Sequence, residues 1–105
     1  METPNLNYIN ELSGDNEQFK EKIIKIIKKE LFTEVELYDA HIKKLDFFNA
    51  SQSVHKLKHK ISILGLEKSY YIASDYENNL NNDSLALKDD FETILQVLQE
   101  YVLKL

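Results

Sequence analysis

The chain has 105 residues, of which 43% are hydrophobic and 30% are charged, and its formal net charge is −5. This composition is typical of a folded globular domain and excludes an intrinsically disordered chain. The negative charge argues against general nucleic-acid binding, which depends on neutralising many phosphates, and the absence of cysteine excludes disulfides and thiolate metal sites. With only two glycines and one proline, the chain has few turn signals, so we expect a helical protein.

Two helices are predicted in the first half of the chain. The first is short and covers 5–12. The second covers 15–45 and is long enough to bend. It follows the breaker Ser13-Gly14, and we expect Asp15 to cap it, with a glutamine three residues on completing a capping box. Its apolar residues recur in steps of three and four, which is the spacing of one buried helix face: Phe19, Ile23, Ile27, Leu31, Val35, Tyr38, Ile42 and Leu45.

Three more helices are predicted over 47–64, 67–80 and 84–104. Gly65 ends the first of them, as glycine commonly does, and Asp83 or Ser84 is expected to cap the last. Short connections force neighbouring helices to run antiparallel. We therefore expect an all-α fold, a single domain over 1–105 that forms an antiparallel up-down-up-down four-helix bundle with a short extra N-terminal helix.

Three lysines lie in a segment that has no acidic residue. The gap runs from Asp46 to Glu67 and contains Lys56, Lys58 and Lys60. We interpret it as a local positive field on an acidic body, suited to one anionic group or to an acidic partner site. For Lys56 and Lys60, a solvated helix face is the alternative interpretation.

His55 lies beside the buried face of its predicted helix. It is about 100° round the helix from Val54, and Lys58 follows one turn later on the same face. The small residues Ser51 and Ser62 flank the imidazole. We therefore expect a histidine that is accessible to a partner.

Glu77 interrupts an otherwise apolar stripe on the following helix, and a carboxylate that faces a core is costly unless it is hydrogen-bonded. Glu77 lies twelve residues after Gly65, and His55 lies ten residues before Gly65. Two antiparallel helices joined at Gly65 therefore place Glu77 beside His55. We expect Glu77 to accept a hydrogen bond from Nδ1–H of His55 and to leave the lone pair of Nε2 free. That arrangement describes a nucleophilic imidazole.

The three histidines also allow other interpretations. A surface residue without a role is the expectation for His41. The pair His55 and His59 has a spacing that can hold zinc, with Glu77 as the one candidate third ligand, but neighbouring lysines repel a dication and we expect no metal. The tyrosines Tyr70, Tyr71 and Tyr76 are expected to serve packing.

The segment His55-Lys56-Leu57-Lys58, with Gly65 ten residues after the histidine, resembles the signature of histidine-containing phosphotransfer (HPt) domains. The order of the predicted helices resembles that family over the whole chain. Members commonly carry Gln or Glu on the next helix, 22 positions after the histidine, and Glu77 stands there. One departure is His59, where the family has a glycine that leaves room for the partner.

The resemblance implies a phosphocarrier with no independent turnover, which relays a phosphoryl group between receiver-domain aspartates in a two-component phosphorelay. It implies His55 as the phosphoacceptor, Lys58 as the residue that stabilises the phosphate and Glu77 as the residue that orients His55. The implied partners are receiver domains of hybrid histidine kinases and response regulators, which supply Mg²⁺, so that the chain needs no cofactor of its own. A receiver-docking helical module without chemistry is the alternative.

A ring of residues around His55 is expected to contact the receiver: Phe48, Gln52, His59, Ile63 and Leu66. No apolar run approaches the roughly 20 residues of a membrane span, and no signal-peptide pattern opens the chain. We therefore expect a cytoplasmic monomer that binds neither membrane nor nucleic acid.

Overall fold

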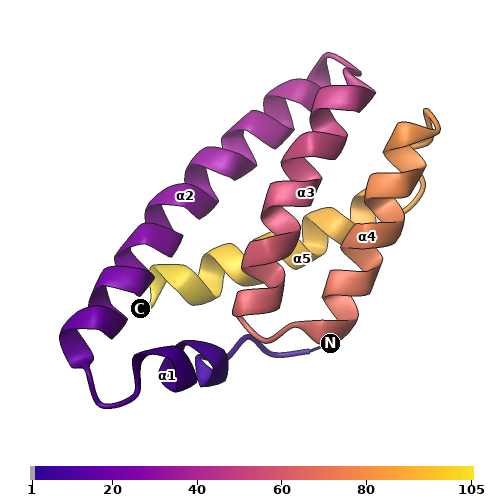
Figure 1. Ribbon diagram of the computed structural model, residues 1–105. Helices are drawn as coiled ribbons and strands as arrows, with labels where there is room; N and C mark the ends of the chain where they lie inside the picture. The colour runs from indigo at the N-terminus through magenta and orange to yellow at the C-terminus, as the bar shows by residue number, and fades with distance from the viewer. Residues whose placement is uncertain (1) are drawn as a thin grey trace.

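The computed structural model describes residues 2–105, which contain five helices (Figure 1). No strand occurs within that range. The expectation of an all-α fold with a short N-terminal helix is confirmed. The helices are α1 (Asn7–Ser13), α2 (Glu17–Lys43), α3 (Phe47–Ile63), α4 (Glu67–Asn81) and α5 (Lys88–Leu103).

The three central helices α2, α3 and α4 lie side by side and alternate in direction (Figure 1). Helix α1 lies across the end of the bundle where α3 turns into α4. Helix α5 runs obliquely behind α3 and α4 and brings the C-terminus to the first half of α2 (Figure 1), where the Lys28 ammonium donates a 2.8 Å hydrogen bond to the Leu105 carbonyl. The molecule is elongated, with extents of 45 × 23 × 19 Å.

One hydrophobic core joins all five helices. Tyr38, Tyr76 and Phe91 are fully buried near its centre, with ring pairs 5.1 to 6.2 Å apart. The hydroxyl groups of Tyr38 and Tyr76 are 2.6 Å apart, and that of Tyr38 also donates to Glu92 at 2.9 Å. Burial raises the pKa of Tyr76 to about 12, so both polar ends stay neutral and satisfied inside the core.

The turns between the central helices have the same design. After α2, Leu45 adopts a left-handed conformation (φ 54°), and after α3 Gly65 does so (φ 84°). In each turn the two amides that follow the helix bond to its last carbonyls, which is a Schellman motif. Asp46 then caps α3 by accepting from the amide of Asn49. These tight turns determine how α2, α3 and α4 are offset from one another along their axes.

The N-terminal segment crosses this end of the bundle and supplies a cap from far away in the sequence. The carboxylate of Glu2 accepts hydrogen bonds of 2.8 Å from the amides of Lys68 and Ser69, in the first turn of α4. Leu66, at the N-cap position, provides no side-chain cap of its own. Nearby, the amide of Asn5 donates to the carbonyl of Leu64 at 2.8 Å.

The predicted N-cap of α2 was wrong, and so was the predicted burial of the two ends of its apolar stripe. Asn16, not Asp15, caps the helix, because its side chain accepts from the amide of Phe19 at 3.0 Å. The apolar stripe is buried from Ile27 to Tyr38, but Phe19 and Leu45 at its two ends are exposed. Phe19 lies in the first turn of α2, and Leu45 lies beyond the helix in the left-handed turn that leads to α3, so neither belongs to the part of the stripe that faces the core.

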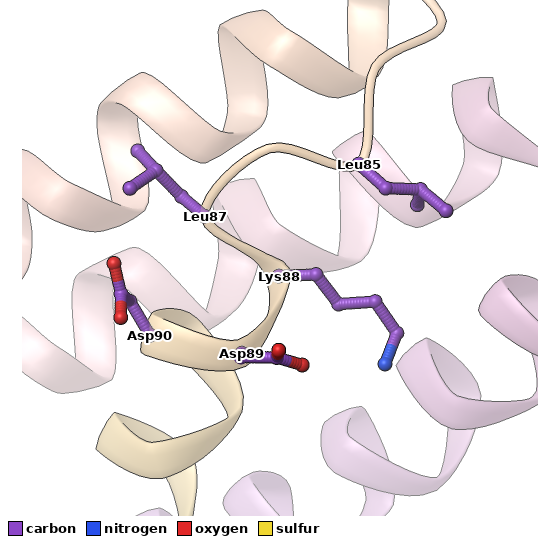
Figure 2. A pocket seen from close by; sticks show the side chains of 5 residues that line it. All are labelled: Leu85, Leu87, Lys88, Asp89 and Asp90. Atoms are coloured by element: carbon purple, nitrogen blue, oxygen red, sulfur yellow. The ribbon is translucent and has the colours of Figure 1, made fainter.

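The predicted start of the last helix was also wrong. Neither Asp83 nor Ser84 caps α5, which begins at Lys88 after Leu87 in a left-handed conformation (φ 74°). Figure 2 shows the turn, with the side chain of Leu87 pointing to one side and those of Lys88 and Asp89 to the other. Leu87 packs against the core, and this contact sets the start of α5.

No helix within residues 2–105 combines the length and the hydrophobicity that crossing a lipid bilayer requires.

Candidate functional site

His55 lies in the middle of α3 on the side that faces α4. Its side chain is 50% exposed, whereas the neighbouring Val54 is fully buried. Nδ1 of the ring is 3.1 Å from Oε2 of Glu77 and 3.3 Å from Oε1. The contact between His55 and Glu77 that the helix register predicted is therefore present.

The contact sets the chemistry of the imidazole. An ionised carboxylate can only accept hydrogen bonds, so Nδ1 of His55 must carry the proton that is shared with Glu77. In the neutral ring the lone pair then resides on Nε2. The described part of the chain offers Nε2 no hydrogen-bond partner, and the ring is accessible to a reactant.

Lys58 holds the other oxygen of Glu77. Its ammonium is 3.0 Å from Oε1 of Glu77 and 3.3 Å from the hydroxyl of Ser74, and it lies 5.4 Å from the centre of the Tyr70 ring. The side chains of Lys58 and Glu77 are only 12% and 18% exposed. His55, Glu77 and Lys58 thus form one hydrogen-bonded row across α3 and α4.

Ser74 and Tyr70 were not predicted as parts of this row. Ser74 lies three residues before Glu77, and Tyr70 lies one turn earlier still, so the three share one face of α4. That spacing was the signal that could have indicated them. Tyr70 is half-buried and packs against the core, as expected.

The expected positive patch is not present as one surface. Lys60 is buried and forms salt bridges with Glu30 at 3.3 Å and Glu34 at 3.4 Å on α2, so its interpretation as a solvated residue was wrong. Lys58 is paired with Glu77 on the other side of α3. Residues two apart on a helix point about 200° apart, and the lysines therefore separate onto two sides. Lys56 alone of the three is exposed.

The histidine pair does not assemble the alternative zinc site. The rings of His55 and His59 are 5.2 Å apart and nearly perpendicular. Among residues 2–105, no group of three or more histidine, cysteine, aspartate or glutamate side chains is placed to hold a metal ion. Glu77, the candidate third ligand, is occupied by His55 and Lys58.

Four of the five expected docking residues are accessible. Phe48 is 67% exposed, Gln52 and His59 are exposed and Ile63 is half-buried. Leu66 is buried, so its expected exposure was wrong. The reason is the left-handed turn at Gly65, which redirects the chain and turns the next side chain into the core.

Tyr8 joins this surface from α1, and sequence reasoning missed it. With His59, Ser62 and Ile63 it lines a cavity of about 370 Å³, one turn below His55 on α3. Nothing in the sequence places α1 against this part of α3. The accessible surface around His55 therefore spans two helices, and its members are aromatic, apolar or neutral polar residues and a histidine.

No family model, curated protein or solved structure matches the chain. The resemblance to HPt domains therefore depends on the short motif around His55, on Glu77 and on the order of the helices.

The site has the parts of a nucleophilic centre. It offers an accessible imidazole nitrogen with a free lone pair, a carboxylate that fixes the tautomer and can stabilise a developing imidazolium, and an ammonium group that holds the carboxylate in place. The His55 side chain is half-exposed, so the protein does not enclose the ring.

Proposed function

We propose that the chain is a histidine phosphotransfer protein, with His55 as the phosphoacceptor of a two-component phosphorelay. The observation that carries the proposal is the contact of 3.1 Å between Nδ1 of His55 and Glu77 on a half-exposed face of the bundle. It supplies a nucleophilic Nε2 at the surface of the molecule. The resemblance of the His55 segment to the HPt signature points the same way.

The proposed step is an in-line phosphoryl transfer. The lone pair of Nε2 forms a bond to the phosphorus of an aspartyl phosphate while the bond from phosphorus to the aspartate oxygen breaks, and the leaving carboxylate keeps that electron pair. The ring thereby becomes an imidazolium that retains its Nδ1 proton. Glu77 stabilises this positive charge through the hydrogen bond that it already makes.

Lys58 contributes positive charge close to the reacting group. Because its ammonium is bonded to Glu77 and Ser74, it supports the carboxylate first, and contact with a phosphoryl oxygen requires a rotation of the side chain toward His55. Attraction between the lysine segment and an acidic partner site contributes less than the sequence suggested, since two of its three lysines are paired internally.

The partner in this proposal is a receiver domain, whose own acidic pocket and Mg²⁺ would complete the site. The chain then acts in the cytoplasm as a carrier without turnover of its own. The exposed residues beside His55, with Phe48 above it and Tyr8 and His59 below, would contact the receiver.

A labelling experiment tests the proposal. Receiver domains that carry radiolabelled phosphate from acetyl phosphate and Mg²⁺ are incubated with the chain, and the label on the chain is tested for stability. Phosphohistidine gives a label that is stable in base and labile in acid. A receiver that binds the chain and retains its phosphate would instead support the docking module without chemistry.

A further inference from the structure

The exposed side of α3 carries two histidines that lie one helical turn apart. His55 and His59 are four positions apart in the sequence, so they share one face of the helix. Both residues are exposed, and their ring centres are 5.2 Å apart. In helical metal-binding motifs, the same spacing presents two histidines to one zinc ion.

The separation of the two rings fits a single metal ion between them. A zinc–nitrogen bond is about 2.0–2.1 Å long, so the centre of a ligating imidazole lies about 3.2 Å from the metal. Two imidazoles at the tetrahedral angle then have their centres about 5.2 Å apart, which is the separation of His55 and His59. Because His59 is exposed, its ring can turn about two side-chain bonds and direct a nitrogen at the same ion as His55.

Glu77 prepares His55 to bind a metal ion. Nδ1 of His55 is 3.1 Å from Oε2 of Glu77, so Nδ1 carries the proton and the lone pair of Nε2 is available. Histidine ligands of metal ions usually donate their other ring N–H to a carboxylate, which fixes the ring and raises its basicity. Glu77 is therefore placed as an outer partner of the site and not as the third ligand that the sequence suggested.

The charges near the two histidines permit a cation to bind. From the sequence we expected neighbouring lysines to repel a dication. In the structure Lys58 is paired with Glu77 at 3.0 Å, and Lys60 is paired with two glutamates on the α2 side of α3. Lys56 also lies beside residues of α2. The residues that line a cavity together with His59 carry no charge at neutral pH: Tyr8, Ser62 and Ile63.

We propose that His55 and His59 together bind one divalent transition-metal ion of the class of Zn²⁺ and Cu²⁺, with water in the remaining coordination positions. Imidazole nitrogen suits these ions, whereas Mg²⁺ prefers oxygen ligands. The site replaces the expectation that the chain binds no metal. Metal binding does not depend on the proposed phosphotransfer. A bound ion would compete with a phosphoryl group, since both use the lone pair of Nε2 of His55.

Titration calorimetry of the full chain with Zn²⁺ tests the site. The wild-type chain is expected to bind one ion at about pH 7.5, where imidazole is mostly neutral, and Cu²⁺ should bind more tightly than Zn²⁺. His55→Gln and His59→Gln should each weaken Zn²⁺ binding by at least about tenfold, because losing a ligand costs no less than losing an outer partner.

The matched control for this titration is His41→Gln, since His41 is the third histidine of the chain and lies on α2. It should leave the affinity for Zn²⁺ unchanged. Circular dichroism confirms that each variant is folded. Absence of binding at about 1 mM Zn²⁺, or an affinity that either His55→Gln or His59→Gln leaves unchanged, would overturn the proposal.

Nitrogen-15 NMR identifies the ligand atoms. Zn²⁺ should shift the Nε2 resonance of His55 and one ring nitrogen of His59, while Nδ1 of His55 keeps its proton. Mg²⁺ at the same concentration should shift neither ring. Glu77→Ala should weaken Zn²⁺ binding by about 10–100-fold, the range for outer partners of ligating histidines. A shift in only one of the two rings, or an affinity that Glu77→Ala leaves unchanged, would overturn the arrangement.

Discussion

Glu77 on α4 lies level with His55 on α3, with Oε2 at 3.1 Å from Nδ1 of the ring. The two residues are 22 positions apart in the sequence, and the tight turn at Gly65 brings them together. The carboxylate is held from its other side by Lys58 at 3.0 Å. This row of three side chains is the basis of the predictions on phosphotransfer.

His55→Gln and His55→Ala should abolish labelling by a phosphorylated receiver and leave the fold intact. The side chain is half-exposed, so its removal takes little from the core. Label on the protein and the helical circular dichroism signal are the two measurements. A mutant that is still fully labelled would move the phosphoacceptor to His59 or His41.

Glu77→Ala should slow phosphorylation more than Glu77→Gln. Glutamine keeps an oxygen that accepts from Nδ1–H, whereas alanine leaves the ring free to rotate and removes the charge that balances the imidazolium. Transfer rates are compared with the Nδ1–H and Nε2–H tautomer populations of His55, measured by nitrogen-15 NMR. Equal tautomer populations in all three proteins would show that Glu77 does not orient the ring.

Lys58→Ala should slow transfer without abolishing it, because the lysine stabilises charge and holds Glu77 but is not the nucleophile. Lys56→Ala is the matched control: Lys56 lies two residues earlier on the same helix, and its exposed side chain lies beside residues of α2 and not beside Glu77. It should transfer at nearly the wild-type rate. Equal slowing in both variants would assign the effect to the general positive field and not to the row of His55, Glu77 and Lys58.

Lys60→Met should lower the free energy of unfolding by about 1–3 kcal/mol, because it leaves Glu30 and Glu34 close together with no cation between them. The value is below that of fully buried ion pairs because the Glu30 side chain is half-exposed. Urea denaturation measures the loss. Lys56→Met, at an exposed position, should change stability by no more than about 0.5 kcal/mol.

Glu2 should make stability depend on pH. Slight burial acts to raise its pKa, but hydrogen bonds from the amides of Lys68 and Ser69 outweigh that effect and hold the pKa below its usual value of 4.5. The carboxylate therefore stabilises the fold above its unfolded pKa, and the contribution is lost as pH falls through the lowered folded pKa.

The comparison with Glu2→Gln isolates this contribution. At neutral pH the variant should be less stable by about 0.5–1 kcal/mol, the low part of the range for helix caps. The difference should shrink as the pH falls below about 4.5, where Glu2 of the unfolded chain takes up its proton, and should be lost below the lowered pKa of the folded state. A difference that stays constant from pH 7 to pH 2 would show that the charge of Glu2 does not cap α4.

The order of the helices and their buried faces followed from the sequence alone. Apolar residues at steps of three and four lie together on one face of an α-helix, and that face is then buried. Ile27, Leu31, Val35 and Tyr38 form such a stripe and are all buried. The contact between His55 and Glu77 also followed, since a short turn with one glycine leaves a single antiparallel register to consider. Both inferences depend on local geometry that repeats along the chain.

Tertiary structure alone decided which partners the lysines of α3 meet. Lys56, Lys58 and Lys60 occupy alternate positions of one short segment, but α3 directs them toward different neighbouring helices. Only the packing places Glu77 on one side and Glu30 and Glu34 on the other. The cap on α4 comes from Glu2, 66 residues away, and the start of α5 depends on the packing of Leu87. These contacts join segments far apart in the chain, whose relative positions no local periodicity specifies.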